Sequence, residues 1–388
     1  MDITIQPGRL HGELAAIPSK SQAHRYLICA AFADFPTTLI CPQTNRDIEA
    51  TAACLNALGA EILRTQEGYR IVPIEKAPKS AVLNCCESGS TLRFMLPIVG
   101  ALGVDALFQM EGRLPQRPLS PLWEEMERMG CTLSRPTENT IRCHGKLRSG
   151  DYAIDGGVSS QFITGLLFAT SLLDGPCSLS VTGKVESKPY IDMTKAAMNL
   201  FGAPHYHTPG QIVVEGDWSN GAFFLAARAL GNAVVVTNLA ADSPQGDRAA
   251  AALLRDLEEN ITIDASDIPD LVPILAVVAS VKKGAVFTNI QRLRMKESDR
   301  VATVMEMIAN LGGTALSTEE TLTILGTGLA GGTVDSHNDH RIAMAAAIAS
   351  TVCTKPVTIR GAEAVNKSYP TFWEEFRRLG GHYEQHIR

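Results

Sequence analysis

The chain has 388 residues, of which 45% are apolar and 20% charged, and its formal net charge is −6 at neutral pH. This length allows two domains with large cores, and the composition is that of an ordinary soluble globular protein. No apolar run reaches the roughly 18 residues of a membrane span, and the segment Met1–Ile5 lacks the features of a signal peptide. Because the acidic balance also disfavours nucleic-acid binding, we expect a cytoplasmic protein without membrane or nucleic-acid partners.

The nine cysteines contain no C-x-x-C pair; Cys85 and Cys86 are adjacent and the others are scattered. This usage is typical of reduced core thiols rather than of a disulfide framework or a zinc site. The histidines show no H-E-x-x-H spacing either. The sequence therefore predicts free thiols and no metal centre.

The first predicted helix starts near Lys20, before the apolar run 26–32. Ser21 and Arg25 are four residues apart and share a helix face, while Lys20 stands at the helix start. Helix N-termini favour anions, so the segment is a candidate phosphate site. Ser-Lys-Ser before a helix is also common capping sequence, and this alternative stays open for the segment by itself.

Further segments of the first half place hydroxyls, amides or cations at predicted helix starts. A turn with an ordinary N-cap could explain each of them alone, but their recurrence in an acidic protein favours a shared cationic cleft. The candidate residues are Gly89 in segment 87–94, Arg117 just before a helix expected to start at Pro118, Ser159, Ser160 and Gln161 in segment 156–164, and Ser187 and Tyr190 in segment 187–192.

Segment 266–273 is the acidic exception. Asp270 follows a proline and precedes an apolar helix, where N-capping would be the ordinary role of a carboxylate. Among many cations, however, a carboxylate stays ionised and can serve as a general base.

Segment 293–300 packs three cations and two carboxylates directly before a helical pattern that starts at Val301. Ser298 is expected to cap that helix and Gly312-Gly313 to end it. A solvated charge run is the alternative, but Lys296 beside Glu297 at a helix start suits phosphate binding with a neighbouring proton transfer. Arg341 and Lys367 stand before two later helices in the same way.

One pattern recurs along the chain: an amphipathic helix, a glycine, then a strand. The glycines stand at 59, 130, 202, 312 and 380, and a sixth candidate at 253–263 lacks the glycine. The copies indicate three repeats in each half, with a crossover near 216–219. We expect one domain at 17–217 and a second formed by 1–16 and 218–388.

These segments, taken together and in this order, resemble the enolpyruvyl transferase family, in particular the members that act on shikimate 3-phosphate. The resemblance spans the chain from Lys20 to Lys367. It implies an α/β fold of two similar globular domains, each with three βαβαββ-like repeats (an inside-out α/β barrel), and an active site in the interdomain cleft. The domain 17–217 would carry mainly the shikimate 3-phosphate site. The other domain would carry the proton-transfer groups and much of the phosphoenolpyruvate site.

By the same resemblance, the enolpyruvyl group of phosphoenolpyruvate is transferred to the 5-hydroxyl of shikimate 3-phosphate through a tetrahedral intermediate, and phosphate is released. Asp270, Glu297 and Lys20 are the implied proton-transfer groups. The implied shikimate 3-phosphate ligands are Lys20, Ser21, Arg25, Ser159, Ser160, Gln161, Ser187, Tyr190, Asp270 and Lys296. The implied phosphoenolpyruvate ligands are Lys20, Gly89, Arg117, Gln161, Arg300, Arg341 and Lys367.

This chemistry requires no metal or organic cofactor, and the resemblance implies a monomer and a glyphosate target. The chain departs from the common family pattern at Glu87 and Arg292, where asparagine is frequent, so no ligand role is carried over to Arg292. One alternative is the sister enolpyruvyl transferase acting on UDP-N-acetylglucosamine, but the loop 113–118 lacks the cysteine typical of that branch. A non-catalytic anion-binding paralogue is the other alternative. It is disfavoured because Lys20, Asp270 and Glu297 are all present.

Overall fold

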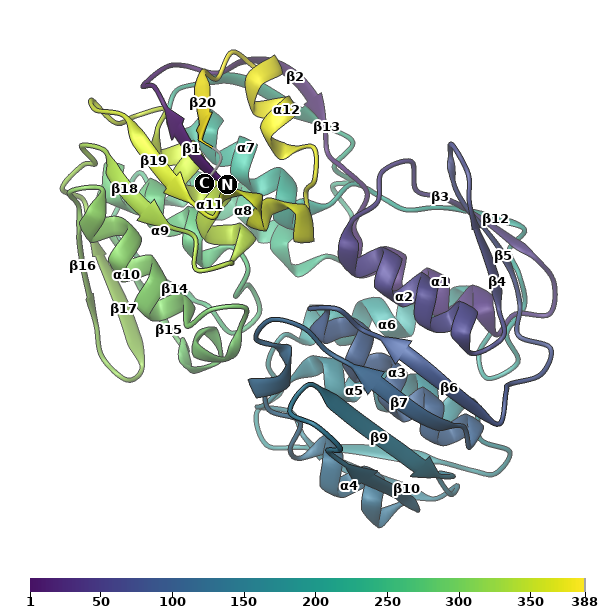
Figure 1. Ribbon diagram of the computed structural model, residues 1–388. Helices are drawn as coiled ribbons and strands as arrows, with labels where there is room; N and C mark the ends of the chain where they lie inside the picture. The colour runs from purple at the N-terminus through teal and green to yellow at the C-terminus, as the bar shows by residue number, and fades with distance from the viewer. Residues whose placement is uncertain (387–388) are drawn as a thin grey trace. The chain divides into compact units, whose positions relative to one another are not determined.

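Helices and strands alternate along the chain, and residue contacts divide it into two units (Figure 1). The computed structural model describes residues 1–386. The middle unit is Pro18–Val214, and the terminal unit combines Met1–Ile17 with the chain from Glu215 onward. The domain limits expected at 17 and 217 lie close to these bounds.

The middle unit contains three sheets with the strand orders β12-β3-β5-β4, β6-β7-β9-β8 and β10-β11. Its strands are β3 (Thr37–Ile40), β4 (Glu61–Arg64), β5 (Gly68–Val72), β6 (Ser80–Asn84), β7 (Asp105–Gln109), β8 (Cys131–Ser134), β9 (Thr140–Gly145), β10 (Asp151–Asp155), β11 (Ser178–Thr182) and β12 (Gln211–Val213).

The terminal unit repeats this plan with the strand orders β18-β19-β1-β20, β14-β15-β17-β16 and β13-β2. Its strands are β1 (Asp2–Ile5), β2 (His11–Ala15), β13 (Ala233–Thr237), β14 (Ile261–Asp264), β15 (Ala285–Thr288), β16 (Thr314–Ser317), β17 (Thr321–Leu325), β18 (Gly332–Asp335), β19 (Val357–Arg360) and β20 (Tyr383–His386). Strand β1 pairs with β20, so the first strand of the chain lies beside the last one (Figure 1).

All four-stranded sheets share one pairing pattern, in which the first pair is parallel and the next two are antiparallel. A parallel pair needs a crossover helix, whereas antiparallel neighbours can be joined by a short turn. The sheets β6-β7-β9-β8 and β14-β15-β17-β16 are each formed by one contiguous βαβαββ segment, whereas β12 and β1 join their sheets from distant parts of the chain. In each unit the third sheet contains only the parallel pair.

Each unit has three central helices that are buried nearly all round and three that are amphipathic. A helix without a polar face must lie inside the core. The central helices are α1 (Lys20–Ala31), α3 (Gly89–Leu102) and α5 (Ser160–Ser171) in the middle unit, and α7 (Trp218–Ala229), α9 (Val272–Val281) and α11 (His340–Ala349) in the terminal unit. Several candidate residues stand at the starts of these helices, among them Lys20, Gly89, Ser160 and Arg341.

The amphipathic helices have one buried face and one exposed face, and short 3-10 turns complete the connections. The helices are α2 (Arg46–Ala57), α4 (Leu122–Arg128), α6 (Lys188–Leu200), α8 (Ala250–Asp256), α10 (Arg300–Asn310) and α12 (Phe372–Arg378), and the 3-10 turns are η1 (Leu114–Gln116), η2 (Gly246–Ala249), η3 (Gln291–Met295) and η4 (Ala362–Lys367).

The glycines of the predicted repeats do adopt positive φ angles: 105° at Gly59, 116° at Gly130, 72° at Gly202, 87° at Gly312 and 96° at Gly380. Side chains with a Cβ rarely adopt such angles, which explains why glycine marks the helix ends. The prediction that these five glycines adopt a helix-ending conformation is confirmed.

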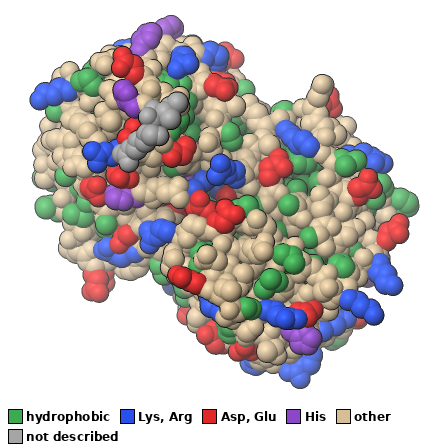
Figure 2. Space-filling view, in the orientation of Figure 1, with side chains coloured by type: hydrophobic (Ala, Val, Ile, Leu, Met, Phe, Trp, Pro, Cys, Tyr) green, Lys and Arg blue, Asp and Glu red, His purple; other side chains and the backbone are tan. Residues whose placement is uncertain are grey.

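All nine cysteines are free thiols, as predicted. Within residues 1–386, no helix is long and apolar enough to cross a bilayer. The same residues contain no group of three His, Cys, Asp or Glu side chains arranged to hold a metal ion. Basic and acidic side chains are interspersed over the face shown in Figure 2.

Candidate active site

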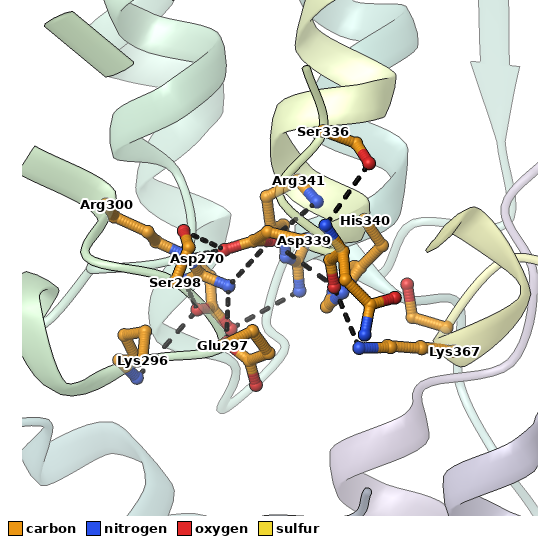
Figure 3. Close-up of polar contacts among 12 residues, drawn as sticks. Asp270, Lys296, Glu297, Ser298, Arg300, Ser336, Asp339, His340, Arg341 and Lys367 are labelled. Atoms are coloured by element: carbon orange, nitrogen blue, oxygen red, sulfur yellow. Dashed lines mark hydrogen bonds and ion pairs between the residues drawn. The ribbon is translucent and has the colours of Figure 1, made fainter. Parts of the chain in front are cut away.

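Arg300 is the centre of the polar cluster in the terminal unit (Figure 3). Its guanidinium donates to Asp339 from Nε at 2.9 Å, to Asp270 from Nη1 at 2.5 Å and to Glu297 from Nη2 at 2.8 Å. The side chain is only 1% exposed. Arg300 is therefore a buried cation that holds Asp270 and Glu297, the two predicted proton-transfer carboxylates of this unit, in place.

The helix start at α10 differs by one residue from the prediction. Asp299, not Ser298, is the N-cap, and its carboxylate accepts from the backbone N–H groups of Val301 and Ala302. Ser298 is instead buried and donates to Asp339 at 3.0 Å. The capping prediction for Ser298 was wrong because a second capping residue followed it, and only the tertiary position of Asp339 selects between them.

Asp270 precedes α9 but does not cap it, since the N-cap position is Leu271. Its oxygens face three cations: Arg300, Arg341 at 3.3 Å from Nη2, and Lys296 at 3.9 Å from Nζ. Burial opposes ionisation here, but Arg341, Lys296 and Arg300 together hold the pKa of Asp270 well below its ordinary value. The carboxyl is therefore ionised at neutral pH, as the general-base interpretation requires.

Lys296 is a partly buried lysine of this cluster, and its surroundings shift the pKa of its ammonium. Burial lowers the pKa of its ammonium to about 8; Asp270 opposes this shift, while Arg292 and Arg300 add to it. Arg292, to which no ligand role was carried over, thus acts electrostatically on Lys296. Deprotonated Lys296 would no longer attract an anion.

We therefore expect the affinity for an anionic substrate to fall as pH rises through about 8, because Lys296 then loses its charge. Lys296→Arg should remove the fall, since guanidinium stays protonated. Arg292→Gln should move it to higher pH. Titrating shikimate 3-phosphate into each protein between pH 6.5 and 9.5 measures both effects. A fall at the same pH in all three proteins would contradict the assignment.

Arg341 and Lys367 complete the cation set of the terminal unit. Arg341 is the second residue of α11, whose N-cap is Asp339, and its guanidinium is 3% exposed. Within residues 1–386, its Nε and Nη1 atoms have no hydrogen-bond partner. Lys367 donates to the backbone carbonyl of Asn338 at 2.8 Å, and in Figure 3 it lies with Lys296 and Glu297 along the lower edge of the cluster.

Asp247 is a buried carboxyl that sequence reasoning did not single out. It lies in η2 and accepts a hydrogen bond from Ser219, while its Oδ1 has no partner within residues 1–386. Burial, and next the negative charge of Asp270, raise the pKa of Asp247 to about 7. No local pattern marks this residue, because a lone aspartate in a turn is usually solvated.

Asp247→Asn is expected to reduce the pH dependence of stability. The raised pKa means that the folded state binds this proton more tightly than the unfolded chain does. The contribution of Asp247 to the free energy of unfolding of the wild type should therefore decrease as pH rises from about 4 to about 7. Asparagine removes that contribution, so the variant should gain stability relative to wild type at pH 8 but not at pH 4.

Unfolding free energies measured at pH 4, 5, 6, 7 and 8 would test this expectation. The exposed Asp242→Asn is the matched control and should leave the pH profile unchanged. An Asp247→Asn variant with the wild-type profile would contradict the burial argument.

Arg25 is the buried cation of the middle unit, 2% exposed. It donates to the backbone carbonyls of Ser21 at 2.7 Å and Tyr190 at 2.9 Å, and to the Thr194 hydroxyl at 2.8 Å. These contacts join the start of α1 to α6. Three of the predicted shikimate 3-phosphate ligands are thereby brought together.

Gln161 is held by two side chains of α3. Its Nε2 donates to Ser90 at 2.9 Å, and its Oε1 accepts from Arg93 at 2.7 Å. Arg93 was not singled out from the sequence, although it lies in the Gly89 segment. It also donates to the carbonyl of Pro118, so it ties the starts of α3 and α5 to the Arg117 loop.

Gly89 and Arg117 are in direct contact, because a Cβ placed on Gly89 would lie 2.6 Å from Arg117 Nη1. Glycine at this position therefore allows the guanidinium to approach the start of α3. The helix expected at Pro118 was wrong: Arg117 follows η1, and α4 begins only at Leu122. The intervening residues form a loop that local proline signals did not distinguish from a helix start.

The remaining residues of the middle unit also stand at helix starts. Ser159 is the N-cap of α5 and accepts from the Gln161 N–H at 3.3 Å, and Ser160 follows it. Ser187 is the N-cap of α6 in a left-handed conformation with φ 54°, which is uncommon for serine and often marks functional loops. Lys20 starts α1 and pairs with Asp47 at 2.9 Å.

Each unit thus contains one cluster of cations and hydroxyls at the starts of its helices. The terminal cluster adds two carboxylates, Asp270 and Glu297, held against Arg300. Such a set suits acid–base chemistry on anionic substrates. The repeated α/β fold and these clusters are those expected of an enzyme that acts on anionic substrates by acid–base chemistry. Comparison with known proteins identifies the family.

The solved structure of EPSP synthase from Acinetobacter baumannii matches this fold with a TM-score of 0.79 at 23% sequence identity, covering 100% of both chains. A sequence model of the family "EPSP synthase (3-phosphoshikimate 1-carboxyvinyltransferase)" matches residues 5–267 and 257–376. A 3-phosphoshikimate 1-carboxyvinyltransferase of Clostridium kluyveri is 38% identical over 420 aligned positions, which cover 99% of this chain and 98% of the relative. One of Clostridium novyi is 37% identical, with 98% of both chains covered.

The chain belongs to the EPSP synthase family. The resemblance inferred from the motifs is confirmed, as are the α/β fold with two domains and the assignment to an enzyme of the carboxyvinyltransferase type. The UDP-sugar alternative is not favoured.

Proposed function

We propose that the protein transfers the enolpyruvyl group of phosphoenolpyruvate to the 5-hydroxyl of shikimate 3-phosphate and releases phosphate, within aromatic amino acid biosynthesis. Full-length relatedness to 3-phosphoshikimate 1-carboxyvinyltransferases supports the reaction. The single observation in the structure that carries it is the pair Asp270 and Glu297 held on Arg300. A non-catalytic paralogue would not need both carboxylates beside this set of cations.

We assign to each substrate ligands from both clusters. For shikimate 3-phosphate we assign Lys20, Ser21, Arg25, Ser159, Ser160, Gln161, Ser187, Tyr190, Asp270 and Lys296. For phosphoenolpyruvate we assign Lys20, Gly89, Arg117, Gln161, Arg300, Arg341 and Lys367.

In the addition step, the 5-hydroxyl attacks C2 of phosphoenolpyruvate while C3 takes a proton, which gives a tetrahedral intermediate. Loss of a C3 proton and of phosphate then forms the enol ether. We assign Asp270 to the hydroxyl proton and Glu297 to C3, with Lys20 beside the phosphate. The Lys and Arg side chains stabilise the departing phosphate, and no metal or organic cofactor enters these steps.

The low pKa of Asp270 fits this role only when the cations around it are partly neutralised. Arg341 and Lys296 lower that pKa, and both are assigned to anionic substrates. A bound carboxylate or phosphate therefore offsets their charge and makes Asp270 a stronger base. Substrate binding would in this way prepare the base for the reaction.

Phosphate release by the purified protein tests the proposal. We expect release only when shikimate 3-phosphate and phosphoenolpyruvate are both present, accompanied by the enolpyruvyl product. Each substrate alone is the control, and UDP-N-acetylglucosamine in place of shikimate 3-phosphate tests the sister reaction. A folded protein that releases no phosphate from the pair would contradict the proposal. Monomeric state, cytoplasmic location and inhibition by glyphosate stay predictions.

A further inference from the structure

Asp47 is a carboxylate at a helix start that faces a cation at another helix start. It lies in the first turn of α2, and its Oδ2 is 2.9 Å from Lys20 Nζ, at the first position of α1. Both side chains are only 16% exposed. A cation at a helix N-terminus opposes the helix dipole, whereas a carboxylate there is favoured. Asp47 therefore offsets an unfavourable position of Lys20 and restrains its flexible side chain.

A buried chain of hydrogen bonds connects this pair to α3. Thr91 Oγ1 donates to the backbone carbonyl of Asp47 at 3.4 Å and lies 2.8 Å from the hydroxyls of Ser88 and Thr51. Thr51 in turn lies 2.7 Å from Nδ1 of His24 on α1. Four of these side chains are at most 2% exposed: Thr91, Ser88, Thr51 and His24. The starts of α1, α2 and α3 are thus joined by one polar network.

The charged groups near this network point to Lys20 as the ion-pair partner of Asp47. Burial, and next the charges of Lys20 and Arg25, lower the pKa of His24 well below its ordinary value, so the ring is neutral. Arg46, the neighbour of Asp47 on α2, is exposed, and Glu49 accepts from the Tyr69 hydroxyl at 2.9 Å. Asp47 is consequently the carboxylate of α2 that pairs with Lys20.

We propose that Asp47 is a positioning residue that holds the Lys20 ammonium at the common start of α1, α2 and α3, and thereby sets the affinity for phosphoenolpyruvate. The inference rests on the proposed function, in which Lys20 contacts that substrate. Asp47 itself acts through Lys20. Sequence reasoning missed it because the two residues are 27 positions apart and their helices must pack before the pair exists.

Asp47→Asn keeps the shape of the side chain but removes its charge. We expect KM for phosphoenolpyruvate to rise roughly tenfold, with a smaller effect on KM for shikimate 3-phosphate. In a Lys20→Met background the same substitution should have no further effect on kcat/KM, since the partner is gone. Asp47→Glu should restore part of the affinity. Glu49→Gln, which removes a charge from the same helix turn, is the matched control and should leave KM unchanged.

A second readout needs no catalysis. In NMR of lysine-labelled protein without substrate, the signal lost in Lys20→Met identifies Lys20. In Asp47→Asn we expect this signal to titrate at lower pH than in wild type, and in Glu49→Gln at the wild-type pH. The inference would be overturned if the Lys20 signal titrated at the same pH in Asp47→Asn as in wild type. It would also be overturned if Asp47→Asn lowered kcat/KM in the Lys20→Met background as much as it does in wild type. A wild-type enzyme that releases no phosphate would instead overturn the proposed function, so the two failures are distinguishable.

Discussion

Glu297→Gln is expected to lower kcat by roughly 10²–10⁴-fold while the protein stays folded. Glutamine can still accept the hydrogen bond that Arg300 Nη2 donates to Glu297 at 2.8 Å, so the geometry of the cluster is kept. It cannot give or take a proton at C3 of the substrate. The effect should therefore fall on kcat more than on KM.

Single-turnover phosphate release and thermal unfolding measure the two parts of this prediction. Running the reaction in heavy water adds a direct readout, because deuterium entry at C3 of phosphoenolpyruvate should disappear in Glu297→Gln. Glu306→Gln is the matched control: it removes a carboxylate from α10 that is 47% exposed and pairs with His337. A near-normal rate in Glu297→Gln would remove Glu297 from the mechanism.

Arg300→Met should destabilise the terminal unit by about 3–5 kcal/mol. Arg300 is 1% exposed and binds Asp270, Glu297 and Asp339, the last of which is fully buried. Removing the cation takes away the guanidinium that the three carboxylates share and leaves the fully buried Asp339 without this ion pair, although Asp270 still faces Arg341 and Lys296. The loss should consequently be far larger than that of an exposed ion pair.

Denaturant unfolding followed by hydrogen exchange of the α9, α10 and α11 amides would locate this loss, because a protein with two domains need not unfold in one step. Arg294→Met is the control, since Arg294 is 37% exposed and pairs with Asp299 at 3.6 Å. Adding Asp339→Asn to Arg300→Met should recover part of the stability by removing one uncompensated charge. A loss below about 1 kcal/mol would contradict the central role given to Arg300.

Local patterns predicted the helix starts well, because a cap, a charged first turn and a helical period all lie within a dozen residues. Lys20, Gly89, Ser159 and Arg341 each stand within one residue of the first residue of a helix, as expected. The errors at Ser298 and at Pro118 arose where two capping signals competed or where proline marked a loop. These positions differ by local energies too small for a single sequence to resolve.

The sequence by itself determined the repeated α/β organisation, the glycine-terminated helices and the identity of most candidate residues, since each depends on short-range periodicity and residue chemistry. Only the tertiary structure decided how charges pair. Arg300 reaches Asp339, 39 residues away, and Lys20 reaches Asp47, 27 residues away, once their helices pack. Burial likewise shifts the pKa values of Asp247 and Lys296. Desolvation and long-range ion pairing are properties of the packed chain, and no local pattern encodes them.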